Sequence, residues 1–287
     1  MKWREKITFG MLIVSMLFST AVLGRNLWMQ EKEQIKFEIL RNRISAERER
    51  SSATAEVKRT GDKMMKSLNG EERAVLPEYQ ELAEKNPDFV GWIFIDGTNI
   101  DYPVMQTLWE PEYYLHRNFT GEYSYAGVPF VGSGDIKAEN EDIFIYGHNM
   151  RNGTMFADLL KYKEKQYLQD HPVIRLDTLW ERRQYEIFAV LDVSEEEWSQ
   201  EGGMFNSYGT NFILNRKEYL KKLEKRSLCK NDITVEINDR LLFMVTCSYQ
   251  KENGRIVIVA RNRWKQNSIS VFSCRRLNCY MQFSENK

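Results

Sequence analysis

Two apolar runs near the C-terminal end constrain the fold more than any other feature of the chain. Residues 241–246 (LLFMVT) and 255–260 (RIVIVA) are rich in branched and aromatic side chains, and the polar sequence at 251–254 separates them. Runs of this length with turn residues between them predict two adjacent β-strands. The first strand ends at Cys247 and the second begins at Arg255. A thiol and a guanidinium are therefore expected close together at one rim of a sheet, an arrangement suited to covalent chemistry on an acyl group.

The sequence from residue 76 to residue 240 alternates short apolar runs with turn residues. Further strands are expected at 92–95, 100–104, 127–131, 142–147, 173–177 and 184–193. Helices are expected at 77–86, 155–169 and 216–226, the last with Asn215 as its N-cap, a single turn or loop at 113–119, and a polar loop at 194–211. About eight strands at this spacing predict a mostly β fold with inserted helices, as a closed barrel or sandwich rather than a doubly wound sheet.

The N-terminal region contains an uncharged stretch at residues 7–24 (ITFGMLIVSMLFSTAVLG) behind a short basic tip. As a helix it would span about 27 Å, close to the hydrocarbon thickness of a bilayer. The basic tip predicts a signal anchor with its N-terminus in the cytoplasm and the rest of the chain outside. A cleaved signal peptide is the alternative, because Val22-Leu23-Gly24 resembles a small-residue cleavage site.

Residues 26–75 are dense in Glu, Lys and Arg, and contain no glycine or proline before Gly61. This composition predicts a solvated helical spacer between the anchor and the folded domain. A coiled-coil dimer is the sharper alternative, but the apolar positions are too irregular for heptads.

Composition excludes some classes of function and leaves others open. The chain has 41 basic and 41 acidic residues, and no basic stripe interleaved with aromatics, so nucleic acid is not an expected partner. Its four cysteines and three histidines lack the spacing of a zinc site. A disulfide between Cys274 and Cys279 would be compatible with a secreted chain, but nothing in the sequence requires it.

A proton donor for the thiol is the remaining requirement, and His148 in the sequence FIYGHN is the best candidate. Cysteine attacks only as the thiolate, and at unperturbed pKa values the thiolate–imidazolium pair is about 1% as populated as the neutral pair. That fraction suffices if the groups are positioned. Arg255 can stabilise an oxyanion without losing its charge, and His148 can protonate a leaving amine.

With these motifs the chain from about residue 76 to 260 resembles a sortase, specifically of class B. Val245-Thr246-Cys247 resembles the family's cysteine strand end, Gly254-Arg255 its arginine strand, and Tyr146-Gly147-His148 its histidine motif. The runs NIDYPVMQ at 99–106 and YL…NF at 114–119, and the helix at 216–226, are also similar to class B sequences. Phe243-Met244 departs from the common Thr-Leu of the family, which affects packing rather than chemistry.

The resemblance implies a closed eight-stranded β-barrel with an N-terminal helical extension and one transmembrane helix. It divides the chain into a cytoplasmic tip and anchor at 1–25, a charged helical spacer at 26–75, a catalytic domain at 76–262 and a tail of unassigned role at 263–287. It assigns Cys247 as nucleophile, His148 as acid and Arg255 as donor to the oxyanion or substrate. It aligns four further residues with the substrate groove: Leu115, Tyr146, Tyr208 and Thr246.

The implied function is a single-pass membrane transpeptidase on the outside of a Gram-positive cell, with no cofactor. It would cleave a C-terminal sorting signal of a secreted protein and pass the acyl group to an amine of a peptidoglycan precursor or a pilin-like subunit. The acidic cluster that forms the class A calcium site has no match. The alternatives are a cell-wall cysteine peptidase, which the order His148 before Cys247 disfavours, and an inactive membrane-tethered peptide-binding module.

Overall fold

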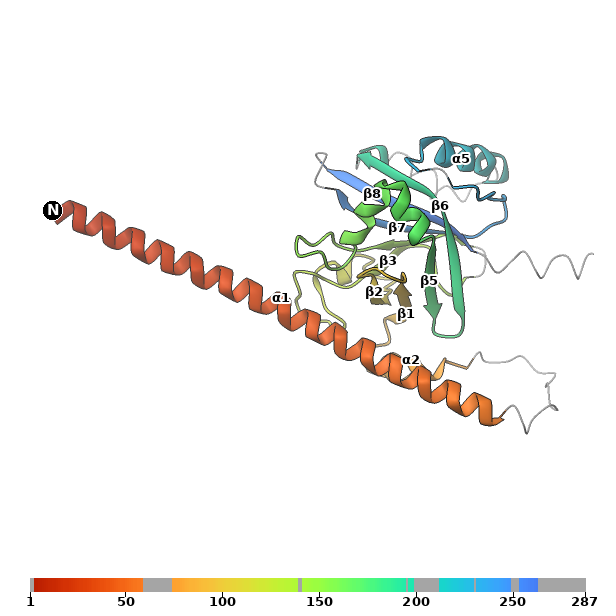
Figure 1. Ribbon diagram of the computed structural model, residues 1–287, viewed down its shortest axis with the longest axis horizontal. Coiled ribbons are helices and arrows are strands. Elements are labelled where there is room, and N and C mark those ends of the chain that lie inside the picture. The colour runs from red at the N-terminus through yellow and green to blue at the C-terminus, as the bar shows by residue number, and fades with distance from the viewer. Residues whose placement is uncertain are drawn as a thin grey trace, which may run out of the picture.

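The computed structural model describes residues 3–58, 74–138, 141–194, 196–198, 212–229, 231–248 and 253–262. A single long helix, α1 (Trp3–Lys58), runs beside a β-barrel and continues well past it toward the N-terminus (Figure 1). Among the described residues α1 is the one helix that is long and apolar enough to cross a membrane, and the side chains of its apolar window are not buried.

Eight strands close into a barrel in the order β1-β2-β3-β4-β7-β8-β6-β5, which confirms the predicted fold class. Their bounds are β1 Phe89–Phe94, β2 Asp101–Met105, β3 Phe130–Ser133, β4 Ile143–Tyr146, β5 Val173–Thr178, β6 Arg182–Ser194, β7 Leu241–Ser248 and β8 Gly254–Asn262. The expected strand at 127–131 lies slightly later in the chain, at β3.

Strands β7 and β8 are buried on both faces, which is why they read as continuous apolar runs. Alternate residues face two different cores. Met244 and Ile258 belong to the main core, whereas Phe243 and Val259 belong to a second cluster that includes Leu220 of helix α5 (Phe212–Arg226). The hairpin is thus the central wall between barrel interior and covering helix.

Other helices in the described part of the chain are α2 (Pro77–Lys85), η1 (Tyr113–His116), η2 (Ala157–Lys163) and α3 (Lys165–Asp170). The prediction of one helix over 155–169 is wrong, because a 3₁₀-helix ends before Glu164, whose backbone is extended, and a separate helical turn follows. The fully buried side chains Phe156, Leu159 and Tyr162 recur every three residues, the period of a 3₁₀-helix. Asn215 is not an N-cap, since α5 begins three residues earlier, at Phe212.

The sequence predicted a solvated spacer in the charged part of α1, but the structure shows this part packed against the barrel domain. Phe37 and Ile44, two turns apart on one face, are buried against the barrel domain. The Phe37 ring packs edge-on against Tyr102 of β2 at 5.2 Å between centroids, and Arg41 Nε donates to the Asp101 carbonyl at 2.8 Å. Two apolar residues on a charged helix are enough to dock it, because the barrel supplies the complementary surface.

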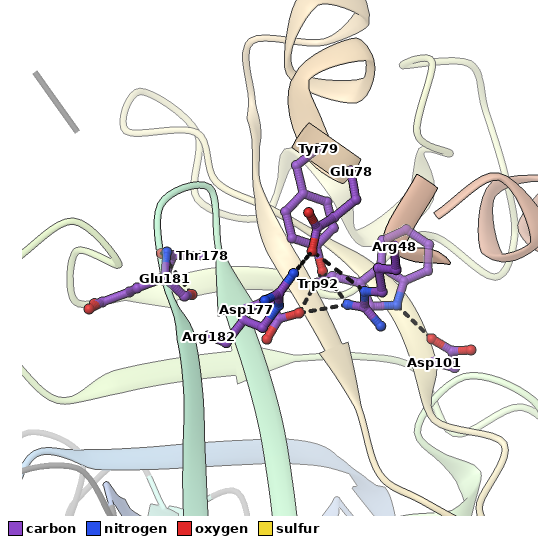
Figure 2. Close-up of polar contacts among 9 residues, drawn as sticks. All are labelled: Arg48, Glu78, Tyr79, Trp92, Asp101, Asp177, Thr178, Glu181 and Arg182. Carbon is purple, nitrogen blue, oxygen red and sulfur yellow. Dashed lines mark hydrogen bonds and ion pairs between the residues drawn. The ribbon is translucent and has the colours of Figure 1, made fainter. Parts of the chain in front are cut away.

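A buried charge cluster fixes the C-terminal half of α1 to α2 and to the β5–β6 turn (Figure 2). Arg48 Nη2 lies 2.6 Å from both Asp177 Oδ2 and the Tyr79 hydroxyl, and that hydroxyl donates to the same carboxylate at 2.7 Å. The Glu78 carboxylate is fully buried and pairs with Arg182. Buried carboxylates require such partners, so α1 completes the domain rather than merely leading to it.

Several predictions concern residues outside the described part of the chain. These are the tail at 263–287 with Cys274 and Cys279, the predicted groove residue Tyr208, and most of the loop at 194–211, of which 196–198 are helical.

Candidate active site

The predicted nucleophile and the predicted arginine face each other across the β7–β8 ladder. Cys247 is the register partner of Arg255, one pair from the end of the hairpin at Ser248–Gly254. Both residues are partly exposed, and the Cys247 thiol is not bridged to another described cysteine. The two groups therefore lie at the rim of the barrel, as the two apolar runs predicted.

His148 reaches the same rim because β4 runs parallel to β7. Tyr146 at the end of β4 pairs with Val245, so the chain two residues further on brings His148 level with Cys247. Three hydrogen bonds extend this pairing past the strand end: the Gly147 amide to the Val245 carbonyl at 3.1 Å, the Thr246 hydroxyl to the Gly147 carbonyl at 2.7 Å, and Asn149 Nδ2 to the Cys247 carbonyl at 3.0 Å. The histidine and cysteine segments are thus held directly to each other.

Gly147 permits this close approach. A Cβ at this position would lie 2.7 Å from the ring of Phe156, a fully buried residue that follows the site. The Phe156 amide donates to the His148 carbonyl at 2.9 Å, which fixes the backbone on the other side of the histidine.

The imidazole of His148 is held by the segment between β2 and β3. Its Nε2 lies 3.0 Å from the Leu115 carbonyl oxygen, and because a carbonyl only accepts, this nitrogen carries the hydrogen. Nδ1 is then the nitrogen left to exchange a proton. The ring of His116 lies 5.2 Å from that of His148.

Burial lowers the pKa of His148, and the neighbouring His116 lowers it further, while the Leu115 carbonyl acts in the opposite direction. The resting imidazole is therefore neutral at physiological pH and is suited to accept a proton before it donates one.

Tyr146 lines the same rim beside the predicted arginine. Its ring stacks on Phe130 at 5.9 Å and covers Gly132, where a Cβ would lie 2.7 Å from the tyrosine ring. Burial raises the pKa of Tyr146, whereas a hydrogen bond with Trp198 and the charge of Arg255 lower it. The phenol thus stays protonated as a donor at the rim.

Most of the predicted site residues come together, and the structure adds two that the sequence did not identify. Cys247, His148, Arg255, Tyr146 and Leu115 all lie at this rim. Thr246 is buried and uses its hydroxyl on the Gly147 carbonyl, so its described contact is structural. The additions are Asn149 and His116; the position of Asn149 directly after the histidine was the available signal.

The described residues contain no group of three or more His, Cys, Asp or Glu side chains that could hold a metal ion.

Comparison with known proteins assigns the chain to a family. The sortase domain family matches residues 93–263. Sortase B of Listeria monocytogenes is 36% identical over 207 residues, covering 69% of this chain and 78% of the relative. The crystal structure of Clostridium perfringens sortase B superposes with a TM-score of 0.58 at 36% identity, covering 64% of this chain and 98% of that one.

A Staphylococcus aureus sortase B–substrate complex shares the fold, with a TM-score of 0.65 at 23% identity over 81% of this chain and 97% of that one. The matched residues include both strands of the β7–β8 hairpin and the end of β4. The chain therefore belongs to the sortase family, and within it to class B, whose members are cysteine transpeptidases.

Proposed function

We propose that this transpeptidase acts through a thioester on Cys247, with His148 as acid and base and Arg255 as the fixed positive charge. The observation that carries the proposal is the register of three strands, which places all three residues at one rim although they come from three separate segments. No other free thiol among the described residues is exposed, since Cys229 is buried.

In the first half-reaction, the Cys247 thiol gives its proton to Nδ1 of His148 and the sulfur attacks the substrate carbonyl carbon. The resulting oxyanion is stabilised by the Arg255 guanidinium, which keeps its charge throughout. When the carbon–nitrogen bond breaks, the His148 imidazolium returns the proton to the leaving amine. The products are a thioester and a free amine.

In the second half-reaction, an amine attacks the thioester and a new amide forms. The attacking nitrogen loses a proton to the neutral His148, and the Cys247 sulfur leaves and is protonated again. The lowered pKa of His148 favours this step, because the neutral imidazole is the proton acceptor that it needs. Hydrolysis by water is the competing outcome, so the amine must reach the thioester first.

The substrate of this proposal is a C-terminal sorting signal, of the Leu-Pro-x-Thr-Gly or Asn-Pro-x-Thr-Asn kind that the family resemblance implies. A Staphylococcus aureus sortase B of the same fold has been solved as a substrate complex, which supports a substrate site on this barrel. The predicted groove residues are Leu115, Tyr146, Tyr208 and Thr246. The acceptor would be an amine of a peptidoglycan precursor or of a pilin-like subunit.

The proposal also includes a membrane anchor in residues 1–25, with the N-terminus cytoplasmic and the catalytic domain at 76–262 outside. It is supported by the apolar, unburied window of α1 and the basic residues before it. The described part of the former spacer, up to Lys58, is a continuation of the same helix.

Full-length protein in detergent, mixed with sorting-signal peptides and hydroxylamine, tests the thioester. Hydroxamate product is expected from the wild type and from Cys229→Ala, a matched removal of a buried thiol, but not from Cys247→Ala. Hydroxamate from Cys247→Ala would overturn the mechanism. Hydrolysis without hydroxamate would favour a peptidase, and binding without turnover an inactive peptide-binding module.

A further inference from the structure

Helix α1 contacts the barrel domain in an order that fixes the direction of the active rim. Arg48 pairs with Asp177 at the end of β5, Arg41 with Asp101 at the start of β2, and Lys36 with Glu122 between β2 and β3. The contacts thus move from the end of β5 to the segment between β2 and β3 as α1 is followed toward its apolar half.

Strand β6 relates these contacts to the site. It begins with Arg182, which pairs with Glu78 of the buried charge cluster, and its far end pairs Val193 with Arg255. The charge cluster and the active rim are therefore at opposite ends of the barrel. Figure 1 shows the same relationship, since the C-terminal end of β6 points toward the side on which the N-terminal half of α1 extends. The active rim faces the apolar end of the helix.

An exposed apolar surface lies on this side of the molecule. It consists of one leucine and three aromatic side chains between β2 and β3, and we call it the aromatic surface. The exposed fractions are 83% for Leu108, 69% for Trp109, 67% for Tyr123 and 63% for Tyr125. Aromatic side chains with one polar edge are the ones enriched where a bilayer meets water.

The aromatic surface is continuous with the active site. The ring of Trp109 lies 5.0 Å from that of Tyr113, over which the Arg117 guanidinium lies at 4.4 Å. Arg117 forms a backbone bridge with Tyr123, and the rings of Tyr123 and His116 stack at 6.5 Å. His116 in turn contacts His148.

The helix sets the height of this surface above a membrane. Between Gly24, at the end of the apolar stretch, and Lys36 the axis rises about 18 Å. The headgroup layer extends about 5–8 Å beyond the hydrocarbon, and spanning helices tilt by about 20° on average, which brings one side of a docked domain closer. The segment between β2 and β3 contacts α1 at Lys36. A loop of this segment that projects toward the apolar end of α1 therefore has only a short distance to cover to the headgroup layer.

We propose that the aromatic surface of Leu108, Trp109, Tyr123 and Tyr125 contacts the headgroup layer of the bilayer and holds the active rim against it. This inference rests on the proposed membrane anchor. Acidic residues Glu110, Glu112 and Glu122 offset Arg117 in the same segment, so apolar and aromatic contact rather than net positive charge drives the interaction. A membrane-held substrate would meet the thiol at the surface on which it already lies.

Photocrosslinking in the full-length protein tests the contact. A benzophenone amino acid replaces Trp109 or Tyr125, and in a control replaces Trp180, a half-buried aromatic residue in the β5–β6 turn at the opposite rim. In phosphatidylcholine nanodiscs, lipid adducts are expected at 109 and 125 and not at 180. Adducts to an added sorting-signal peptide with none to lipid would overturn the proposal and make the surface a peptide site, and no adducts would overturn it outright.

Activity provides the second measurement. The double variant Trp109→Ser/Tyr125→Ser should keep turnover of a soluble peptide within about twofold, because both side chains are on the surface. Turnover of the same peptide carrying an acyl chain in the nanodisc should fall several-fold. An equal loss on both substrates would contradict the membrane role. If alkaline carbonate extracts the full-length protein from vesicles, the anchor fails as well; if the protein is retained but forms no lipid adducts, only this inference fails.

Discussion

Arg48 of the N-terminal helix and Asp177 at the end of β5 form a 2.6 Å ion pair between residues that are 129 positions apart. The Asp177 side chain is almost fully buried, and the Tyr79 hydroxyl donates to the same oxygen. The pair joins the helix that carries the proposed anchor to the rim opposite the active site. The orientation of the active rim depends on this joint.

Replacing Arg48 with alanine should therefore destabilise the domain. Burial raises the pKa of Asp177, and Tyr79 and Arg48 act in the opposite direction. Removing the guanidinium would therefore leave a buried carboxylate without the cation that stabilises its charged form. The expected loss in unfolding free energy is about 2 kcal/mol, below that of a fully buried pair because the Arg48 side chain is 30% exposed. Denaturant melts of the full-length protein in detergent measure it.

Arg43→Ala is the matched control, because Arg43 of the same helix forms an exposed ion pair with Glu81 of α2, and its loss should cost much less stability. The Arg48→Ala deficit should also shrink as the pH falls into the acidic range, since the raised pKa of Asp177 means that this carboxylate is protonated at a higher pH than an ordinary aspartate. Equal losses in the two variants would show that α1 is not fixed by the buried cluster.

The second prediction concerns the acidic limb of the pH–rate profile. The lowered pKa of His148 places the acidic limb of kcat/KM below about 6.5, the ordinary value for histidine. Replacing the neighbouring ring with His116→Gln should raise the pKa of His148 and move that limb to higher pH. Kinetics on a soluble peptide between pH 4.5 and 8 measure the shift.

His171→Gln is the control for this shift, because His171 bonds to the Asp96 carbonyl, away from the site. A limb that moves equally in both variants, or not at all in His116→Gln, would rule out the coupling between the two histidine rings.

The sequence predicted the barrel and its reactive rim because these depend on local patterns. Residues 241–245 and 256–260 are apolar at every position since both faces of the hairpin are covered, and the antiparallel pairing of the two strands sets Cys247 opposite Arg255. The Tyr146-Gly147-His148 motif places the histidine by the same logic, one strand further along.

The docking of α1 could not be read in this way. Phe37 and Ile44 are sparse apolar residues in a charged helix, and the surface that buries them is formed by β2 and α2, far along the chain. His116 appeared isolated for a related reason, because only the fold of the η1 segment brings its ring to His148. Contacts between segments that are far apart in the sequence leave no periodic pattern of apolar residues from which they could be predicted.

The third prediction concerns Asn149, a buried residue whose Nδ2 donates to the Cys247 carbonyl at 3.0 Å. Asn149→Ala removes a bond between the histidine and cysteine segments, so the two reactive groups are held less firmly. Stability should fall by about 1 kcal/mol, whereas kcat/KM should fall by about tenfold or more because misplacement of reacting groups is costly.

Peptide cleavage and denaturant melts on the same preparations separate these two effects. Asn152→Ala is the control, since the Asn152 carboxamide only accepts from Thr154 in an exposed turn of the same loop. If the loss of stability fully accounts for the loss of activity, Asn149 has a purely structural role.

The last prediction separates the charge of Arg255 from its shape. Arg255 pairs in register with Cys247, and its charge also acts on Tyr146 at the same rim. Lysine keeps the positive charge but offers a single ammonium in place of a planar fork of donors. If the guanidinium binds the developing oxyanion, Arg255→Lys should lower kcat about 100-fold with little change in KM, as for other oxyanion donors.

Arg261→Lys, on the same strand but paired with Glu186 at the other end of the barrel, should remain active. A rise in KM at unchanged kcat in Arg255→Lys would instead assign the guanidinium to binding the ground-state peptide.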